Sequence, residues 1–219
     1  MIEEALKTAK KIRDESRRAE AFADIAEALA SMGKVDKALS IARDIRDEYY
    51  RGKALANIAY ALLSMGKVDA AFSIAREIRN ESWHDRALVA IVRKIRDEFR
   101  RDRALASMRK VNKVLSIARE IRNESWRAEV LAEIAKALAS TGKVYWVLSI
   151  AREVRDIRDE SWRDKAFIEI AEALASMGEA DEAFSIAREI RNEYWRNIAL
   201  TRIDRALARR ALKALGGSR

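Results

Sequence analysis

A two-helix period of about 33 residues runs through this chain and restricts its fold more than any other feature. The string Ser-Ile-Ala-Arg begins at Ser40, Ser73, Ser116, Ser149 and Ser185. Turn glycines recur with the same period at Gly33, Gly66, Gly142 and Gly178, and aromatic residues at Tyr50, Trp83, Trp126, Trp162 and Trp195. A period of this length is typical of stacked helical hairpins, each of which needs a neighbour to bury its apolar face.

Each period predicts two amphipathic helices. The first is typified by residues Ala19–Met32, where Phe22, Ile25, Ala26 and Leu29 follow helical spacing. We expect Gly33 to end it in the left-handed conformation. The second is typified by Asp36–Glu48, and we expect the Asp36 carboxylate to accept hydrogen bonds from free amides at its start.

The unit resembles the tetratricopeptide repeat, nominally 34 residues long. Small residues stand at close-packing positions of that family, Ala26 and Ala38, and the run from Gly33 to Ala38 is similar to the family's inter-helix turn. The sequence departs from the family where its Trp is replaced, by Phe22, Leu55, Leu131 or Phe167, and where aromatic residues replace its Pro. The resemblance implies an all-α, right-handed α–α superhelix, a solenoid. A related two-helix solenoid is the alternative.

We expect one domain over residues 1–219, with one degenerate unit in the middle. Its predicted parts are an N-terminal capping helix (1–17), two regular repeats (18–83), a degenerate fused repeat (84–126), two further repeats (127–195) and a C-terminal capping helix with a tail (196–219). Polar replacements at both ends, such as Thr8 and Asp204, suit the exposed faces of an array.

The degenerate unit allows two interpretations. The favoured one is a helix over 85–99, a turn at 100–102 and one long helix over 103–125. The competing one is a single helix over 85–108. Three extra residues near 155–159, a duplicated Arg-Asp-Ile, are nearly one helical turn, so we expect a longer second helix there.

Composition excludes several classes. The chain has no Cys and no Pro, which excludes disulfide-built scaffolds and disfavours turn-rich β folds. No apolar run approaches membrane-spanning length, so we expect a cytoplasmic protein with no membrane contact. The absence of Cys and Gln and the dense pairing of Arg with Glu suit a thermophile.

We find no residue constellation for catalysis. His84 is the only His, and metal sites and triads need several convergent groups. Gly-Lys pairs such as Gly33-Lys34 follow a helix and lack the phosphate-loop pattern. The sequence therefore predicts a non-enzymatic protein without a cofactor or metal.

In the resembling family, the concave face made by the first helices holds a peptide. The matching positions are Glu20, Ala23, Glu27, Lys53, Ala56, Tyr60, Glu129, Ala132, Lys136, Lys165, Ile168 and Glu172. The family's carboxylate clamp is not reproduced, and only Asn57, beside Lys53 and Tyr60, comes close. We expect a peptide, if bound in this groove, to contact Lys53, Asn57 and Tyr60.

Two further features mark candidate contact surfaces. Tyr145 and Trp146 replace polar residues at the start of a second helix, and their role is either partner contact or local packing. Residues 93–113 and 196–219 each carry a net charge of +6 within a chain of +9, with Arg100, Arg101, Arg103, Arg209 and Arg210 as the candidate basic patch. We therefore predict a scaffold for a protein or peptide, for which an acidic partner fits the charge. The alternatives are a nucleic-acid-binding solenoid and a self-associating module; the sequence does not give the oligomeric state.

Overall fold

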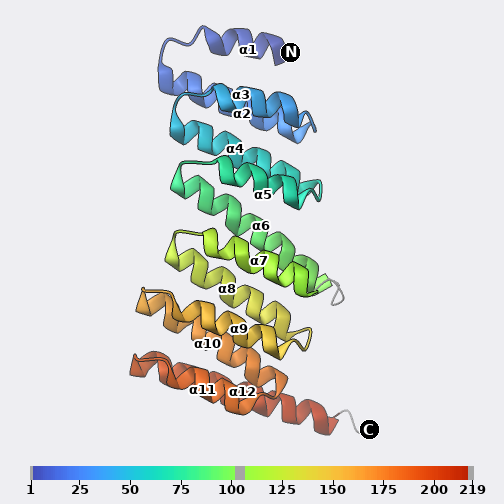
Figure 1. Cartoon of the computed structure of the whole chain (residues 1–219), viewed down its shortest axis with the longest axis vertical. Coiled ribbons are helices and arrows are strands. Elements are labelled where there is room, and N and C mark those ends of the chain that lie inside the picture. The colour runs from blue at the N-terminus through green and yellow to red at the C-terminus, as the bar shows by residue number, and fades with distance from the viewer. Residues whose placement is uncertain (1, 102–106, 217–219) are drawn as a thin grey trace. The chain divides into compact units, whose positions relative to one another are not determined.

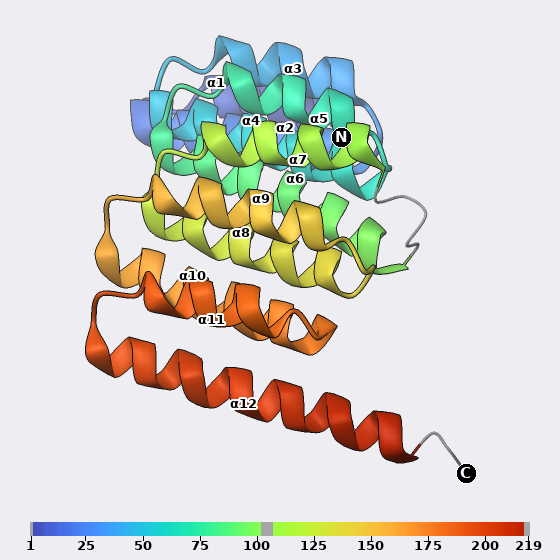
Figure 2. The same ribbon diagram turned by 60° about the horizontal axis from the view of Figure 1, so that its bottom comes forward.

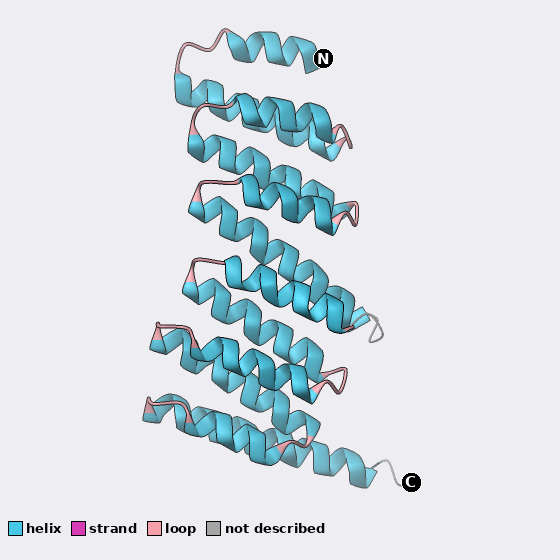
Figure 3. Cartoon of the chain, viewed as in Figure 1, coloured by secondary structure: helices cyan, strands magenta, loops and turns pink. Residues whose placement is uncertain are grey.

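The computed structural model describes residues 2–101 and 107–216, and within them the chain is all-helical. Twelve helices account for 84% of the described residues, which contain no strand (Figure 3). None of the helices described combines the length and apolar character needed to cross a membrane. The predicted all-α class is confirmed.

The chain divides into two compact units, an N-terminal unit of residues 1–91 and a C-terminal unit of residues 92–219. Helices α1 to α5 belong to the N-terminal unit: α1 (Ile2–Lys10), α2 (Glu15–Ser31), α3 (Val35–Asp44), α4 (Glu48–Ser64) and α5 (Val68–Glu77). Helix α6 (Glu81–Arg101) contains the boundary. The C-terminal unit continues with α7 (Met108–Glu120), α8 (Glu124–Ala139), α9 (Val144–Arg155), α10 (Glu160–Met177), α11 (Ala180–Arg188) and α12 (Glu193–Gly216).

Each unit is built by contacts between near neighbours in the chain (Figure 1). In the N-terminal unit, α2 packs against both α3 and α4, and α4 also packs against α5. In the C-terminal unit, α10 packs against α8, α9, α11 and α12. Small residues allow this close approach, since Ala26 and Ala38 are fully buried as expected.

Four turn glycines end the first helix of a hairpin. Gly33, Gly66, Gly142 and Gly178 have φ values of 76°, 74°, 77° and 95°. At the first of these turns, the amide of Lys34 donates to the carbonyl of Leu29 across 2.9 Å. This is the predicted left-handed helix end, which Gly adopts without steric cost.

The observed helix boundaries differ from the predicted ones where each first helix begins. Residues predicted to end a second helix form a turn, and α3 ends at Asp44 instead of Glu48. The Asp47 carboxylate caps α4 by accepting from the Tyr50 amide at 3.0 Å. The same cap recurs at Asp14, Asn80, Asn123, Asp159 and Asn192. The caps satisfy amides that a helix start leaves free, which places the helix boundary there.

The predicted cap at Asp36 is wrong. Lys34 occupies the N-cap position of α3, and its side chain makes no capping hydrogen bond. Asp36 is the second residue of the helix, where an acidic side chain in the first turn interacts favourably with the helix dipole. The second helices α5, α9 and α11 likewise begin without a side-chain cap.

The degenerate unit differs from both interpretations. Helix α6 does not end at 99 but continues through Arg100 and Arg101, because Ile95 and Phe99 bury its apolar stripe to that level. Residues 102–106, including Arg103, lie outside the described residues. Ser107 is extended, which contradicts one helix over 85–108, and Ile121 ends α7 before the predicted residue 125.

Arginine–glutamate pairs link successive second helices 34 residues apart in each unit. Arg43 donates to Glu77 at 2.8 and 3.0 Å in the N-terminal unit. In the C-terminal unit Arg119 pairs with Glu153, and Arg155 with Glu189.

Helix α9 has 12 residues where α3 has 10, which confirms the predicted lengthening.

Candidate functional site

A groove between α8 and α10 is the clearest hollow with an apolar floor among the described residues. It encloses about 280 Å³ and lies on the side of the first helices. Its lining comprises Ala128, Glu129, Ala132, Glu133 and Lys136 of α8 with Trp162, Lys165, Ala166 and Glu169 of α10. Glu129, Ala132, Lys136 and Lys165 are among the positions that the resemblance implies for peptide contact, and the structure brings them together.

Helical spacing explains the groove. Ala128 and Ala132 are four residues apart and share one face of α8, opposite Ala166 of α10. The Asp159 cap starts α10 and puts Trp162 in its first turn, where 36% of the side chain is exposed. Small side chains leave a shallow floor, and the indole ring forms one wall.

On the α8 side, Glu133 is held by arginines of α6. Arg96 donates to its carboxylate at 2.5 Å and Arg93 at 3.2 Å. Arg93 also pairs with Glu129 at 2.6 Å. These contacts orient both glutamates toward α6, so neither carboxylate crosses the groove to α10.

On the α10 side, Glu169 lies between two cations. Lys136 of α8 pairs with it, and Arg202 of α12 donates to it at 2.7 Å. Burial alone would raise the pKa of Glu169, but the hydrogen bonds from Lys136 and Arg202 outweigh burial and lower it. Glu169 therefore stays ionised, and the charged rim is neutralised by its own pairs.

Lys165 behaves differently from the other cations of the rim. Its ammonium lies 4.1 Å from the centre of the Trp162 ring and 5.7 Å from that of Trp195. Both distances fall within the range of a cation–π contact. The half-buried ammonium thus sits beside the groove on aromatic faces.

The sequence-predicted trio Lys53, Asn57 and Tyr60 occupies the matching positions of the N-terminal unit. Lys53 crosses from α4 to Asp24 of α2 at 3.2 Å, and Asn57 donates to Glu27. Tyr60 is half-buried, and burial raises its pKa against the opposing effect of Arg86. Lys53 and Asn57 are thus engaged between helices, and a binding role for the trio stays a prediction.

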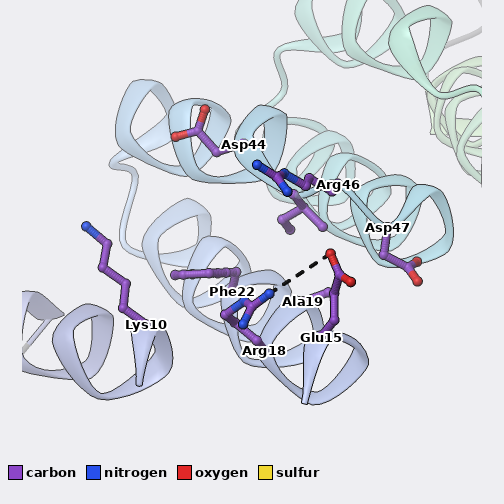
Figure 4. Close-up of a pocket in the computed structure, with 9 residues that line it drawn as sticks. Lys10, Glu15, Arg18, Ala19, Phe22, Asp44, Arg46 and Asp47 are labelled. Atoms are coloured by element: carbon purple, nitrogen blue, oxygen red, sulfur yellow. Dashed lines mark ion pairs between the residues drawn. The ribbon is translucent and has the colours of Figure 1, made fainter. Parts of the chain in front are cut away.

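A second hollow of about 360 Å³ lies where the end of α1, the start of α2 and the α3–α4 turn meet (Figure 4). Charges of both signs surround Phe22, Ala19 and Ile45, and the ion pair between Arg18 and Glu15 measures 4.0 Å. Arg18 also donates to the carbonyl of Ile12 at 3.0 Å. These contacts hold the turn together, so the hollow is a by-product of the helix junction.

The other sequence-predicted contact residues lie at helix ends. Tyr145 and Trp146 form an edge-to-face pair in the first turn of α9, with ring centres 5.3 Å apart and Tyr145 67% exposed. Arg100, Arg101 and Arg209 are exposed. Arg210 instead donates to the Ser176 carbonyl at 3.3 Å and lies against Gly178, so it closes the end of α10.

Much of the predicted basic charge is neutralised locally. Within 93–113, Arg93 and Arg96 pair with acids of α8, and Lys110 pairs with Glu98 at 3.5 Å. Within 196–219, Arg202 pairs with Glu169 and Glu172. The sequence count therefore overstates the charge that a partner meets.

Buried polar side chains lie at the starts of α6 and α10. His84 Nδ1 is 3.0 Å from Asp85 Oδ1, at the helix-start position where Arg18 stands in α2. Burial raises the pKa of Asp164, while the amide of Asn192 opposes the shift.

The described residues contain no group of three or more acids or histidines suited to a metal ion.

No protein-family model matches the sequence, and no curated protein sequence matches it either. Among solved structures, the chain is similar to the crystal structure of Ton1535 from Thermococcus onnurineus NA1. The alignment covers 92% of this chain and 83% of that chain, with 16% identity and a TM-score of 0.27. A TM-score this low does not establish a common fold, so no statement about family or function follows from it.

Proposed function

We propose that this chain is a TPR-like, right-handed α–α solenoid that binds a peptide or an extended segment of a protein without catalysis. The period of the sequence supports the architecture, as does the packing of α2, α8 and α10 on both the hairpin partner and the next first helix. The α8–α10 groove is the proposed binding site.

One observation carries this proposal. The glutamates of the rim are paired with cations, whereas Trp162 is 36% exposed beside a floor of closely packed alanines. Exposed aromatic surface beside a small-residue floor is typical of interfaces in which one anchoring side chain is buried.

Charge and shape together define the ligand. An apolar side chain fits against Trp162 and the floor of Ala132 and Ala166. Lys165, stacked on Trp162, is placed to pair with a carboxylate next to that side chain. The proposed ligand is therefore an extended peptide in which an acidic residue adjoins an apolar one.

Selection from a phage-displayed random peptide library tests the proposal. We expect enriched peptides to combine an acidic and an apolar residue, and a labelled enriched peptide to bind the full chain in fluorescence anisotropy. Lys165→Ala should weaken this binding about tenfold, the size of effect found at a central interface contact. The matched control Lys53→Ala removes the lysine at the same repeat position of α4 and should leave affinity unchanged.

Two results contradict the proposal. One is enrichment of no peptide above background. The other is an equal loss of affinity in Lys53→Ala and Lys165→Ala, because equal losses show that the groove is not the site.

A further inference from the structure

Three helix ends of the C-terminal unit lie at one edge. They are the last turn of α6, the first turn of α7 and the α8–α9 turn (Figures 1 and 2). Lys110 of α7 pairs with Glu98 of α6 at 3.5 Å, which holds two of these ends together. We call this set of residues the turn edge.

Ion pairs between α6 and α8 bring the third end to the same level. Arg93 pairs with Glu129 and Arg96 pairs with Glu133, so the two helices run in parallel. Arg100 comes one helical turn after Arg96, at about 1.5 Å per residue. It is therefore level with the last turn of α8, directly before the α8–α9 turn.

The exposed charged side chains of the turn edge are cationic, and they lie beside exposed apolar side chains. The cations are Arg100 and Arg101 of α6, Arg109 of α7 and Lys143 before α9. Met108 is 68% exposed, and Tyr145 67% exposed beside the half-buried Trp146. Two of the predicted basic residues, Arg100 and Arg101, thus lie on one surface with the predicted aromatic pair, although 44 residues separate Arg101 from Tyr145 in the chain.

Acidic residues lie at the borders of this surface. Glu98 is paired with Lys110, and Asp97 with Arg96. The start of α11 carries Glu179, Asp181 and Glu182, so the cationic surface ends before the α10–α11 turn. Arg205, Arg209 and Lys213 of α12 lie outside the turn edge.

We propose that the turn edge binds single-stranded nucleic acid. Arginine and lysine side chains neutralise backbone phosphates, and exposed aromatic rings stack on unpaired bases. A duplex hides its base faces, so Tyr145 and Trp146 add affinity only for a single strand. An acidic protein supplies negative charge but no flat bases for two adjacent rings. This site is separate from the proposed peptide groove and does not depend on it.

Fluorescence anisotropy with labelled oligo(U) RNA, oligo(dT) DNA and a duplex DNA, at two salt concentrations, tests the proposal. The first variant combines Tyr145→Asp with Trp146→Lys, the residues found at the matching positions 36 and 37, and leaves the net charge unchanged. The second combines Arg100→Ser, Arg101→Ser and Arg109→Ser. The matched control combines Arg205→Ser, Arg209→Ser and Lys213→Ser, which removes the same charge from α12.

We expect both single strands to bind more tightly than the duplex, with affinity that falls steeply as salt rises. The aromatic variant should weaken single-strand binding about tenfold, the size of effect seen when a stacking ring is lost. The three-arginine variant should also lower the salt slope by about 2. The control should stay within about twofold of the unmodified chain.

Absence of binding at micromolar protein overturns the proposal. So does polyglutamate that competes as well as oligo(U), because charge alone then explains the affinity. An unchanged aromatic variant or an equally weakened control overturns it too. Photo-crosslinking of oligo(U) to the unmodified chain gives an independent readout if a variant fails to fold, since crosslinks must fall on Tyr145, Trp146 or their neighbours and not on α12.

Discussion

The surface between α2 and α4 and the groove between α8 and α10 use the same repeat positions but pair their charges differently. In the N-terminal unit, Lys53 crosses to Asp24, and this ion pair bridges the two first helices. In the C-terminal unit, the matching Lys165 lies on Trp162, and the matching Glu133 is held by Arg96. Both surfaces are bridged elsewhere, by Asn57 with Glu27 and by Lys136 with Glu169. They differ at one position, because Lys53 crosses to an acid and Lys165 lies on a ring.

This difference shows how helix pairs with the same caps and turns can present different surfaces. The caps and turn glycines agree in both units. What changes is the carboxylate's partner, because α6 of the degenerate repeat supplies Arg93 and Arg96. The arginines of α6 in the irregular unit thus hold Glu133, and Lys165 of α10 lies on Trp162 instead.

The largest predicted effect comes from removing the arginines that hold Glu133. Arg93→Ala with Arg96→Ala should lower the free energy of unfolding by about 2 kcal/mol, since charged hydrogen bonds of a half-buried carboxylate are lost. Urea denaturation measures this loss. Glu133 should then pair with Lys165 as Asp24 pairs with Lys53, which weakens binding of a library-selected peptide.

The control is Arg43→Ala, whose side chain is 55% exposed and should cost only about 0.5 kcal/mol. Equal costs for this control and the double variant contradict the special position of Glu133.

A smaller predicted effect is a difference in how the stability of the two surfaces depends on pH, because α4 has Asn57 where α10 has Glu169. The pKa of Glu169 is lowered in the folded chain, so its contribution is present above the unfolded pKa and is lost as pH falls through the folded pKa. Glu169→Asn should cost about 1 kcal/mol at neutral pH, and this cost should shrink steadily as the pH falls into the acid range in which Glu169 becomes protonated. Urea denaturation at neutral and acid pH checks this, and a cost that persists in acid refutes the assignment.

Removing a helix cap should lower the free energy of unfolding by the same amount in both units. Asp47→Ala and Asp159→Ala each remove a cap from a first helix and should each cost about 1 kcal/mol. Thermal denaturation of the two variants measures both. A much larger loss in one unit would mean that the scaffolds differ, not only the surfaces.

The smallest predicted change in stability concerns the aromatic wall. Trp162→Tyr introduces the residue that α4 has at position 50 and should change the free energy of unfolding by less than about 0.5 kcal/mol. It should nevertheless weaken peptide binding several-fold, because the ring area facing the groove shrinks. Tyr50→Trp, measured in the same anisotropy assay, should leave affinity unchanged.

Local rules made the helical class predictable from the sequence. Apolar spacing gave the helices, and glycine placed the four turns with positive φ. The caps of the first helices were missed, although Asp or Asn followed by Glu stands at every one of them, as at Asp47 and Asn123. That signal would have corrected the ends of α3 and α5.

The open groove could not be derived from the sequence, because it depends on contacts between helices. Lys53 and Lys165 occupy the same repeat position, and nothing local shows that one reaches an acid and the other a ring. The choice depends on Arg96, 37 residues before Glu133, and on the register of α6. The resemblance named four positions that line the groove, Glu129, Ala132, Lys136 and Lys165, but it did not single out this pair of helices. The superhelix and the peptide ligand stay predictions.

Alanine methyl groups offer the most direct test of the central claim, that a peptide binds at the α8–α10 groove and not at the α2–α4 surface. An NMR titration of methyl-labelled chain with a library-selected peptide follows Ala132 and Ala166 in one place and Ala23 and Ala54 in the other. The account predicts shifts for Ala132 and Ala166 only. Shifts at Ala23 and Ala54, or at neither pair while the peptide binds, would contradict it.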